Sequence, residues 1–190
     1  MRGTMIETEA WTYETLAACS KKELEEVLLT GTAPDPEQLE GYIYCGWNHE
    51  WVGTLSGRKF KKGFRKREGR SFGFNEQVEQ TGAAPTGEWK VRMKDGRHRP
   101  LGFFRVGLTA DEPVNSLNRP YRHTGHFNYH VPINKWLNWF FKVIRDFAVL
   151  PNPGDHGLIL CKAYFQLGPL RIFYCYFLLG HRQPLDFDPW

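Results

Sequence analysis

The last third of the chain carries the pattern that most constrains the fold. Two strongly apolar segments, residues 157–166 and 170–181, are separated only by a short Gly168-Pro169 turn. Apolar runs on both sides of such a turn are typical of a buried antiparallel hairpin. A two-residue loop would place Cys161 and Cys175 on opposite faces of this hairpin, whereas a three-residue loop would place them on one face.

Shorter strands are predicted before the hairpin. In residues 88–94, Trp89, Val91 and Met93 alternate with charged residues, and Asp95-Gly96 then favours a tight turn into a partner strand. Residues 59–64 are so strongly charged that an edge strand or a protruding hairpin is expected there. The full set of strand candidates comprises residues 41–48, 59–64, 71–78, 88–94, 101–106, 124–131 and the two closing segments.

Two helices are predicted. Ser20 and Glu23 have capping-box spacing, which indicates a helix over residues 20–30 within a helical N-terminal extension, residues 1–40. A longer helix, packed against the sheet, is predicted to begin near Asn134. Its apolar residues recur at helical spacing: Ile133, Trp136, Leu137, Phe140, Val143, Ile144 and Phe147.

Composition favours one domain, residues 1–190, with its β body in residues 41–190. The chain is 41% apolar and 15% aromatic, which is enough for one substantial core and suits strands. No β-α-β alternation occurs. We therefore expect a mainly β (α+β) fold: about eight antiparallel strands in a barrel or a strongly curved sheet, with the N-terminal helix and the long helix before the last hairpin. Such a barrel is filled by side chains or holds one small ligand.

The sequence predicts a cytoplasmic protein. It lacks a charged leader followed by an apolar run, and its longest apolar stretch is too short to cross a bilayer. The four cysteines do not have the spacing of a disulfide framework, so reduced thiols are expected. No phosphate loop, dinucleotide fingerprint or paired carboxylate motif is present, so no cofactor is predicted. Oligomeric state is left open.

Several segments together resemble known proteins. They are Pro34-Asp35-Pro36-Glu37-x-Leu39-x-Gly41, Gly46-Trp47-Asn48, Arg58-Lys-Phe-x-Lys-Gly-Phe64 and the closing Gly-Leu-x-Leu-x-Lys-Ala-Tyr…Gly-Pro-Leu-Arg pattern. This combination resembles a group of uncharacterised bacterial proteins and implies no activity. The predicted architecture also resembles the lipocalin and calycin barrels, which implies a barrel with a helix packed outside it near the C-terminus. Gly41-Tyr-Ile and Gly46-Trp47 match the usual lipocalin Gly-x-Trp approximately.

Aromatic residues dominate the candidate ligand site. Their hydroxyl and indole N–H groups each need a partner when buried, which favours a cavity that holds a ligand or water. Arg105 could pair with a ligand carboxylate if it points inward, although a surface position is the simpler alternative. The candidate ligand-binding residues are Tyr42, Tyr44, Trp47, Trp89, Phe104, Arg105, His126, Tyr129, Tyr164, Tyr174 and Tyr176.

Histidines supply weak catalytic candidates. His123, His126 and His130 have a spacing that would suit zinc on a helix. On a strand, however, His126 and His130 would lie roughly 13 Å apart at about 3.3 Å per residue, so no metal site is predicted. His126, His130 and Tyr129 remain as candidates for acid–base chemistry.

Three functions fit these patterns. The first is binding of a small, largely apolar or aromatic ligand in an aromatic-lined barrel cavity. The second is a cofactor-independent cyclase or isomerase of secondary metabolism that uses the same cavity. The third is binding of nucleic acid or an anionic surface through residues 58–70. This segment contains eight basic residues and a single acidic one, Glu68. For this segment, a solvated hairpin is the simpler interpretation.

Overall fold

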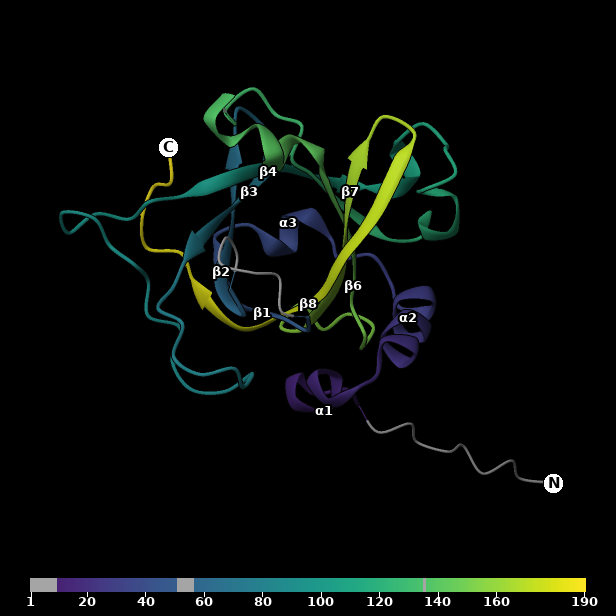
Figure 1. Cartoon of the computed structure of the whole chain (residues 1–190), viewed down its shortest axis with the longest axis horizontal. Helices are drawn as coiled ribbons and strands as arrows, with labels where there is room; N and C mark the ends of the chain where they lie inside the picture. Colours follow the sequence, from purple (N-terminus) through teal and green to yellow (C-terminus); the bar gives the residue numbers. More distant parts are fainter. Residues whose placement is uncertain (1–9, 51–56, 135) are drawn as a thin grey trace.

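The computed structural model describes residues 10–50, 57–134 and 136–190, and in this part of the chain eight antiparallel strands close into a barrel (Figure 1). Each strand pairs with its neighbours in sequence, and β1 pairs with β8 to complete the ring. The strands are β1 (Tyr42–Asn48), β2 (Lys59–Arg67), β3 (Arg70–Gln77), β4 (Leu101–Leu108), β5 (Gly125–Asn128), β6 (Ile144–Val149), β7 (Ile159–Leu167) and β8 (Leu170–Pro184). The predicted barrel and closing hairpin are confirmed, and this architecture is consistent with the lipocalin-like resemblance.

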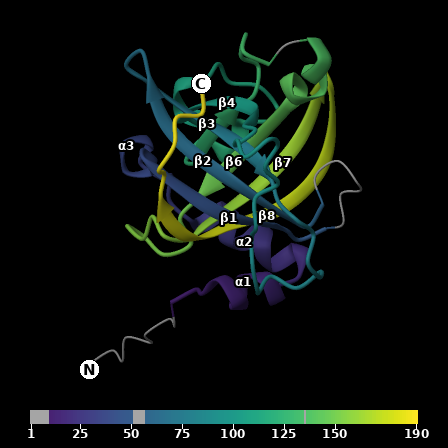
Figure 2. The ribbon, with the colours of Figure 1, turned by 90° about the vertical axis from the view of Figure 1, so that its left-hand side faces the viewer.

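Three α-helices precede the barrel: α1 (Tyr13–Ala18), α2 (Lys21–Thr30) and α3 (Pro36–Leu39). The predicted capping box of Ser20 and Glu23 begins α2. Both α1 and α2 lie against the outer wall, as Figure 2 shows, with α1 beside β8 and α2 beside β7. Leu39 of α3 packs into the interior cluster and covers one end of the barrel. No described helix is long and apolar enough to span a membrane.

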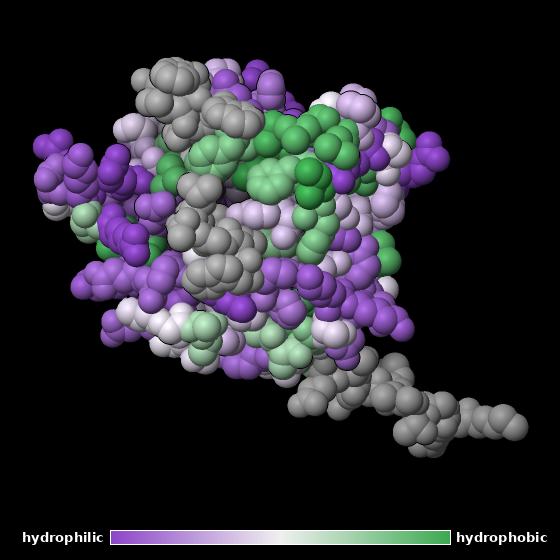
Figure 3. All heavy atoms as spheres, in the orientation of Figure 1, coloured by the Kyte–Doolittle hydropathy of each residue, from purple (hydrophilic) through white to green (hydrophobic). Residues whose placement is uncertain are grey.

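Short 3₁₀ helices lie in the longer connections. They are η1 (Thr109–Asp111), η2 (Arg119–Tyr121) and η3 (Trp136–Val143). η3 lies beyond the end of the barrel opposite α3, which is also where the β7–β8 turn is found. Figure 3 shows apolar side chains gathered on this side of the molecule. The exposed apolar residues of the hairpin are Leu167, Leu170, Ile172 and Phe173.

The predicted long helix before the last hairpin is wrong. η3 ends at Val143, and residues 144–149 form β6, which pairs with both β5 and β7. In this strand Ile144 and Ala148 join the interior cluster, whereas Phe147 belongs to the outer one. Because apolar residues occupy both faces of this segment, their spacing is compatible with a helix as well as a strand. The segment is a strand because it hydrogen-bonds to a neighbouring strand on each side.

The predicted strand at residues 88–94 and the predicted edge position of residues 59–64 are wrong, whereas the strand predicted at residues 101–106 is present as β4. Residues 88–94 make only isolated bridges at Val91 and Lys94 within the described structure, and residues 101–106 pair with β3 and β5 instead. The turn itself is correct, since Asp95 and Gly96 both have positive φ angles. The charged segment that begins at Lys59 is β2, a wall strand paired with β1 and β3 rather than an edge.

The prediction for Cys161 and Cys175 also fails. Leu167 pairs with Leu170 across a two-residue loop, as assumed, but the register shifts between Ala163 and Tyr164. Cys175 consequently lies opposite Ala163, and both cysteines belong to the interior cluster. A bulge inserts one extra residue into a strand, so the side chains beyond the bulge point to the opposite face of the sheet from the one expected. All four cysteines are free thiols.

Two glycines make room for aromatic rings that cross neighbouring strands. A Cβ at Gly73 would lie 2.1 Å from Cζ of Phe104, and a Cβ at Gly63 would lie 2.3 Å from Cζ of Phe74. Phe104 lies inside the barrel and Phe74 outside it. The glycines of β2 and β3 therefore allow tight aromatic packing on both surfaces of the wall.

Candidate functional site

A cavity of about 120 Å³ occupies the end of the barrel opposite α3. Its outer wall is formed by the end of η3, the first residue of β6 and Tyr174, Cys175 and Phe177 of β8. Its floor is formed by Lys62 of β2, Asp146 of β6 and Tyr129, which directly follows β5. The lining includes Asn48, Phe60, Lys62, Asn75, Leu101, Tyr129, Phe140, Phe141, Ile144, Asp146, Ala163, Tyr174, Cys175 and Phe177. Glu76, Gln77, Gln80 and Arg92 also line it, so the cavity wall combines aromatic rings with polar and charged side chains.

Lys62, Tyr129 and Asp146 form a hydrogen-bonded triad on the cavity floor. Nζ of Lys62 lies 2.5 Å from the Tyr129 hydroxyl and 3.4 Å from Oδ2 of Asp146. The Tyr129 hydroxyl in turn donates to Oδ2 of Asp146 at 3.0 Å. The other carboxylate oxygen, Oδ1, is buried and has no hydrogen-bond partner within the described residues. The triad therefore presents an unused acceptor in the barrel interior.

The ammonium group of Lys62 is surrounded by aromatic rings. The lysine side chain is only 1% exposed, so its charge is removed from water. Rings with a negative face stabilise such a cation within about 6 Å of their centroids. The distances from Nζ are 4.3 Å for Phe104, 5.0 Å for Phe177, 5.1 Å for Tyr129, 5.6 Å for Phe127 and 5.8 Å for Phe60.

Burial changes the proton affinities within the triad. It lowers the pKa of Lys62 and raises the pKa of Asp146, because each charged form loses its hydration. Burial also raises the pKa of Tyr129, with the nearby Asp146 charge acting in the same direction. The lysine and aspartate pKa values therefore approach each other, which reduces the cost of moving a proton from Nζ to the carboxylate.

Five of the predicted ligand-binding residues lie in or beside the interior. Tyr129 and Tyr174 line the cavity. Tyr44 and Phe104 are fully buried in the interior cluster, and Tyr44 donates to the backbone carbonyl of His156 at 2.8 Å. Tyr42 packs at the edge of that cluster under the Arg182 guanidinium.

Two predicted residues, Trp47 and Trp89, lie on the outer wall. Their indole N–H groups donate to the carbonyls of Ala83 and Gly46. Lys59 is buried here as well, where it donates to Thr86 O and lies 4.6 Å from the Trp89 ring. Both tryptophans belong to the outer apolar cluster.

Tyr164 and Tyr176 also lie outside the barrel, in a network under α2. Glu25 of α2 accepts a 2.7 Å hydrogen bond from Lys162 and another from Tyr176. Tyr121 donates to the same carboxylate and lies 3.2 Å from the Tyr164 hydroxyl. These tyrosines have partners that attach the helix to the wall.

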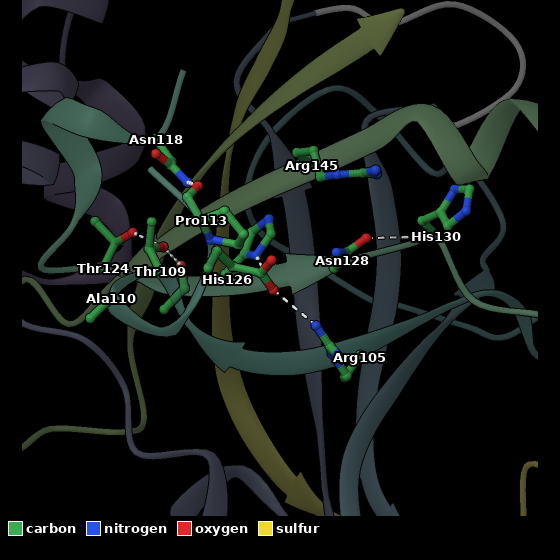
Figure 4. Close-up of polar contacts among 12 residues, drawn as sticks. Arg105, Thr109, Ala110, Pro113, Asn118, Thr124, His126, Asn128, His130 and Arg145 are labelled. Atoms are coloured by element: carbon green, nitrogen blue, oxygen red, sulfur yellow. Dashed lines mark hydrogen bonds and ion pairs between the residues drawn. The ribbon is translucent and has the colours of Figure 1, made fainter. Parts of the chain in front are cut away.

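Arg105 and His126 meet on a different part of the outer wall (Figure 4). Arg105 forms a 2.9 Å ion pair with Glu112, whose carboxylate is also 3.4 Å from Nδ1 of His126. Burial lowers the pKa of His126 to about 4, despite the opposing effect of Glu112. Phe147 stacks on the imidazole. His130 lies apart from this group and is exposed.

The catalytic candidates are therefore separated by the barrel wall. Tyr129 faces the interior, whereas His126 faces outward and His130 is exposed. His123 bonds instead to the Leu28 carbonyl. Across residues 10–50, 57–134 and 136–190, no three His, Cys, Asp or Glu side chains gather as metal ligands would.

The basic segment does not form one charged surface. Lys59 and Lys62 are buried on opposite faces of β2, while Arg58 packs over Trp47. Lys66 pairs with Glu40 at 3.8 Å. Alternation along a wall strand therefore distributes these charges between the barrel interior, its outer wall and solvent.

Lys62 and Asp146 are the site residues that sequence reasoning missed. Phe60, Lys62 and Phe64 are spaced by two, which puts the lysine on the aromatic face of a strand. Ile144, Asp146 and Ala148 have the same spacing. A charged residue with apolar neighbours two positions before and after it was thus the available signal. In residues 59–64 the many other charges obscured this signal, and in residues 144–149 the helical spacing of the apolar residues obscured it.

Comparison with known proteins assigns neither a family nor a function to this chain. No protein-family model matches this chain, and no curated protein or solved structure shows significant similarity to it. The barrel and its cavity are therefore the observations from which a function has to be argued.

Proposed function

We propose that this protein binds a small, largely apolar or aromatic ligand in the barrel cavity, with an uncharged hydroxyl group directed at the floor. The observation that carries this proposal is that Asp146 lines the cavity while its Oδ1 is buried without a hydrogen-bond partner among the described residues. Leaving such an acceptor buried without a partner costs about 1–3 kcal/mol or more, and a ligand donor would recover that energy.

Charge balance supports an uncharged ligand. Lys62 and Asp146 compensate each other on the floor, and the lining also holds one Glu76 and one Arg92, so a ligand carboxylate at the floor would add an excess negative charge beside Asp146. The volume of about 120 Å³ is similar to the roughly 150 Å³ of a dry cavity that holds benzene, so a ligand with a single ring is the size class expected. The ring would contact Phe60, Phe141 and Phe177.

Three probes test the proposal: benzyl alcohol, toluene and benzoate, each measured by ligand-observed NMR. Benzyl alcohol should bind about tenfold more tightly than toluene, because its hydroxyl can donate to Asp146. Benzoate should bind more weakly than either. Equal affinity for all three would contradict a polar floor, and no binding of any probe would contradict the cavity proposal.

A blocking variant tests the location. Ala163 lines the cavity and lies opposite Cys175, so Ala163→Phe should fill the cavity and abolish benzyl alcohol binding. Gln166→Phe makes the same substitution type three residues along β7, outside the lining, and should leave binding unchanged. Loss of binding in both variants, with the fold retained, would contradict this location.

The second candidate is a cofactor-independent isomerase or cyclase that uses the same floor. The favouring observation is the continuous hydrogen-bonded path from Lys62 through Tyr129 to Asp146, which could supply or remove a proton. Exchange of the α-protons of acetophenone in D₂O would test it by NMR. Wild-type protein should accelerate exchange and Asp146→Asn should not; equal rates would contradict this function.

The hypothesis of nucleic-acid or anionic-surface binding through residues 58–70 stays a prediction. Burial of Lys59 and Lys62 removes two of its charges from the surface, so it ranks below the cavity. Salt-sensitive retention of single-stranded DNA by the full chain would favour it.

A further inference from the structure

A primary amine lies on the floor of an aromatic cavity, with a carboxylate and a phenol around it. Lys62 lines the cavity, and its Nζ contacts both the Tyr129 hydroxyl and Oδ2 of Asp146. An amine in this position can do more than donate a hydrogen bond. Once it gives up a proton, its lone pair is a nucleophile directed at a carbonyl carbon.

We propose that Lys62 condenses with a small aromatic aldehyde to form a protonated imine, with Asp146 as its counterion. The inference rests on the proposed ligand site, since the cavity must first admit the aldehyde. It extends that site from reversible binding to covalent capture of one substrate class.

The atoms of the step balance without a further reactant. The Lys62 ammonium gives one proton to Asp146, and the free amine then attacks the aldehyde carbon, forming an N–C bond as the C–O π electrons move to oxygen. A proton passes from nitrogen to that oxygen to give the carbinolamine. Asp146 then returns its proton to the hydroxyl, which leaves as water while the nitrogen lone pair forms the C=N bond. The products are an iminium cation, an Asp146 carboxylate and water.

The surroundings of Lys62 suit both ends of this reaction. An ammonium and an iminium each carry one positive charge, so the charge balance with Asp146 is preserved. The rings around Nζ, nearest among them Phe104 at 4.3 Å, stabilise either cation. The Tyr129 hydroxyl lies 2.5 Å from Nζ and donates to Oδ2 of Asp146 before the reaction. Once Asp146 has taken the proton from Lys62, the hydroxyl can turn and donate to the developing carbinolamine oxygen. Burial lowers the pKa of Lys62, which favours the free amine needed for attack.

The test is reductive trapping on the full wild-type chain. The protein is incubated with one equivalent of benzaldehyde and sodium cyanoborohydride, which reduces an imine to a stable benzyl-lysine. Peptide mass spectrometry then compares Lys62 with Lys61, its half-exposed neighbour on the same strand. We expect benzylation of Lys62 at least about tenfold faster than of Lys61, because bound geometry raises the effective concentration of the aldehyde. Excess benzyl alcohol should slow labelling of Lys62 alone.

Two variants exclude a folding artefact. The double variant Lys62→Met/Asp146→Leu removes the amine without leaving a buried charge unpaired, and it should lose the fast labelling. Lys61→Met should retain it. Preferential labelling of surface lysines, with Lys62 unmodified while wild-type protein still binds benzyl alcohol, would overturn the imine and leave the ligand site intact. Absence of both labelling and benzyl alcohol binding would overturn the ligand site as well.

Discussion

Lys62 and Asp146 project from opposite walls of the barrel and meet inside it, with Nζ and Oδ2 separated by 3.4 Å. Their strands, β2 and β6, stand four places apart in a closed ring of eight described strands. The pair therefore bridges the barrel interior, and Tyr129 on the neighbouring side completes the bridge. Substitutions of this pair should therefore change both the free energy of unfolding of the barrel and the polarity of its cavity.

Removing one member of the bridge should destabilise the fold more than replacing both. Lys62→Met leaves Asp146 buried and unpaired, so the free energy of unfolding should fall by about 3–5 kcal/mol. Lys62→Met/Asp146→Leu should recover most of that loss, because no unpaired charge remains. Urea unfolding of the wild type, both single variants and the double variant measures the coupling. Additive losses would contradict a direct interaction.

Stability should decrease between about pH 6.5 and pH 4 because of His126. Burial lowers the pKa of this imidazole from 6.5 in the unfolded chain to about 4 in the folded protein. Over that range the unfolded chain binds a proton that the folded chain does not, so the contribution present above pH 6.5 is lost on acidification. It amounts to about 3 kcal/mol by the pKa difference. Glu112, Arg105 and Arg145 are the charged groups around the ring.

Substitution isolates this contribution from the other acid-sensitive groups. Chemical unfolding of His126→Gln at several pH values should show a smaller decrease than the wild type. His130→Gln changes an exposed histidine and should reproduce the wild-type profile. Identical profiles for wild type and His126→Gln would contradict the assignment.

Gly73 should not tolerate a methyl group. Its Cβ would lie 2.1 Å from Phe104 and 2.9 Å from the Gly63 carbonyl, so Gly73→Ala should cost about 1–3 kcal/mol in thermal or chemical unfolding. Gly107→Ala is the matched control on the next strand, because its Cβ would meet no described heavy atom within 4 Å. That variant should change stability by less than about 0.5 kcal/mol. Equal costs for the two variants would contradict a clash specific to Gly73.

The rate of thiol modification should distinguish the interior cysteines from the partly exposed one. Burial raises the pKa of Cys161 and of Cys175 well above the usual thiol value, and Cys19 is the partly exposed cysteine. With Ellman's reagent, Cys19 should react first and the two interior thiols only as the barrel opens. Mass mapping of the products identifies each site. Fast modification of Cys175 in the folded protein would indicate a wider cavity entrance.

The sequence was most informative where strongly apolar runs flanked a recognisable turn. The closing hairpin follows directly from such a pattern, whereas apolar alternation before the Asp95-Gly96 turn did not make residues 88–94 a strand. Residues 144–149 were misassigned because a strand buried on both faces has no polar side to distinguish it from a helix. The bulge beside Ala163 had no local signature, and it decided which way Cys175 faces.

The site was harder to predict than the fold, because its main contacts cross the barrel. Lys62 and Asp146 are 84 residues apart in sequence, and their meeting depends on the whole ring closing in the observed register. Aromatic content correctly indicated an aromatic interior. It could not indicate the facing of each ring, so the predicted set mixed Tyr129 and Tyr174 with Trp47 and Trp89 of the outer wall.

The pairing of β1 with β8 has a consequence for how the chain acquires its cavity during synthesis. Residues near the start of the barrel must wait for residues 170–184 before the ring can close, and β8 supplies Tyr174, Cys175 and Phe177 to the lining. Such long-range pairing slows folding, because the entropy cost of closing the long loop comes before the stabilising contacts form. A growing chain on the ribosome accordingly lacks the complete cavity until β8 has emerged.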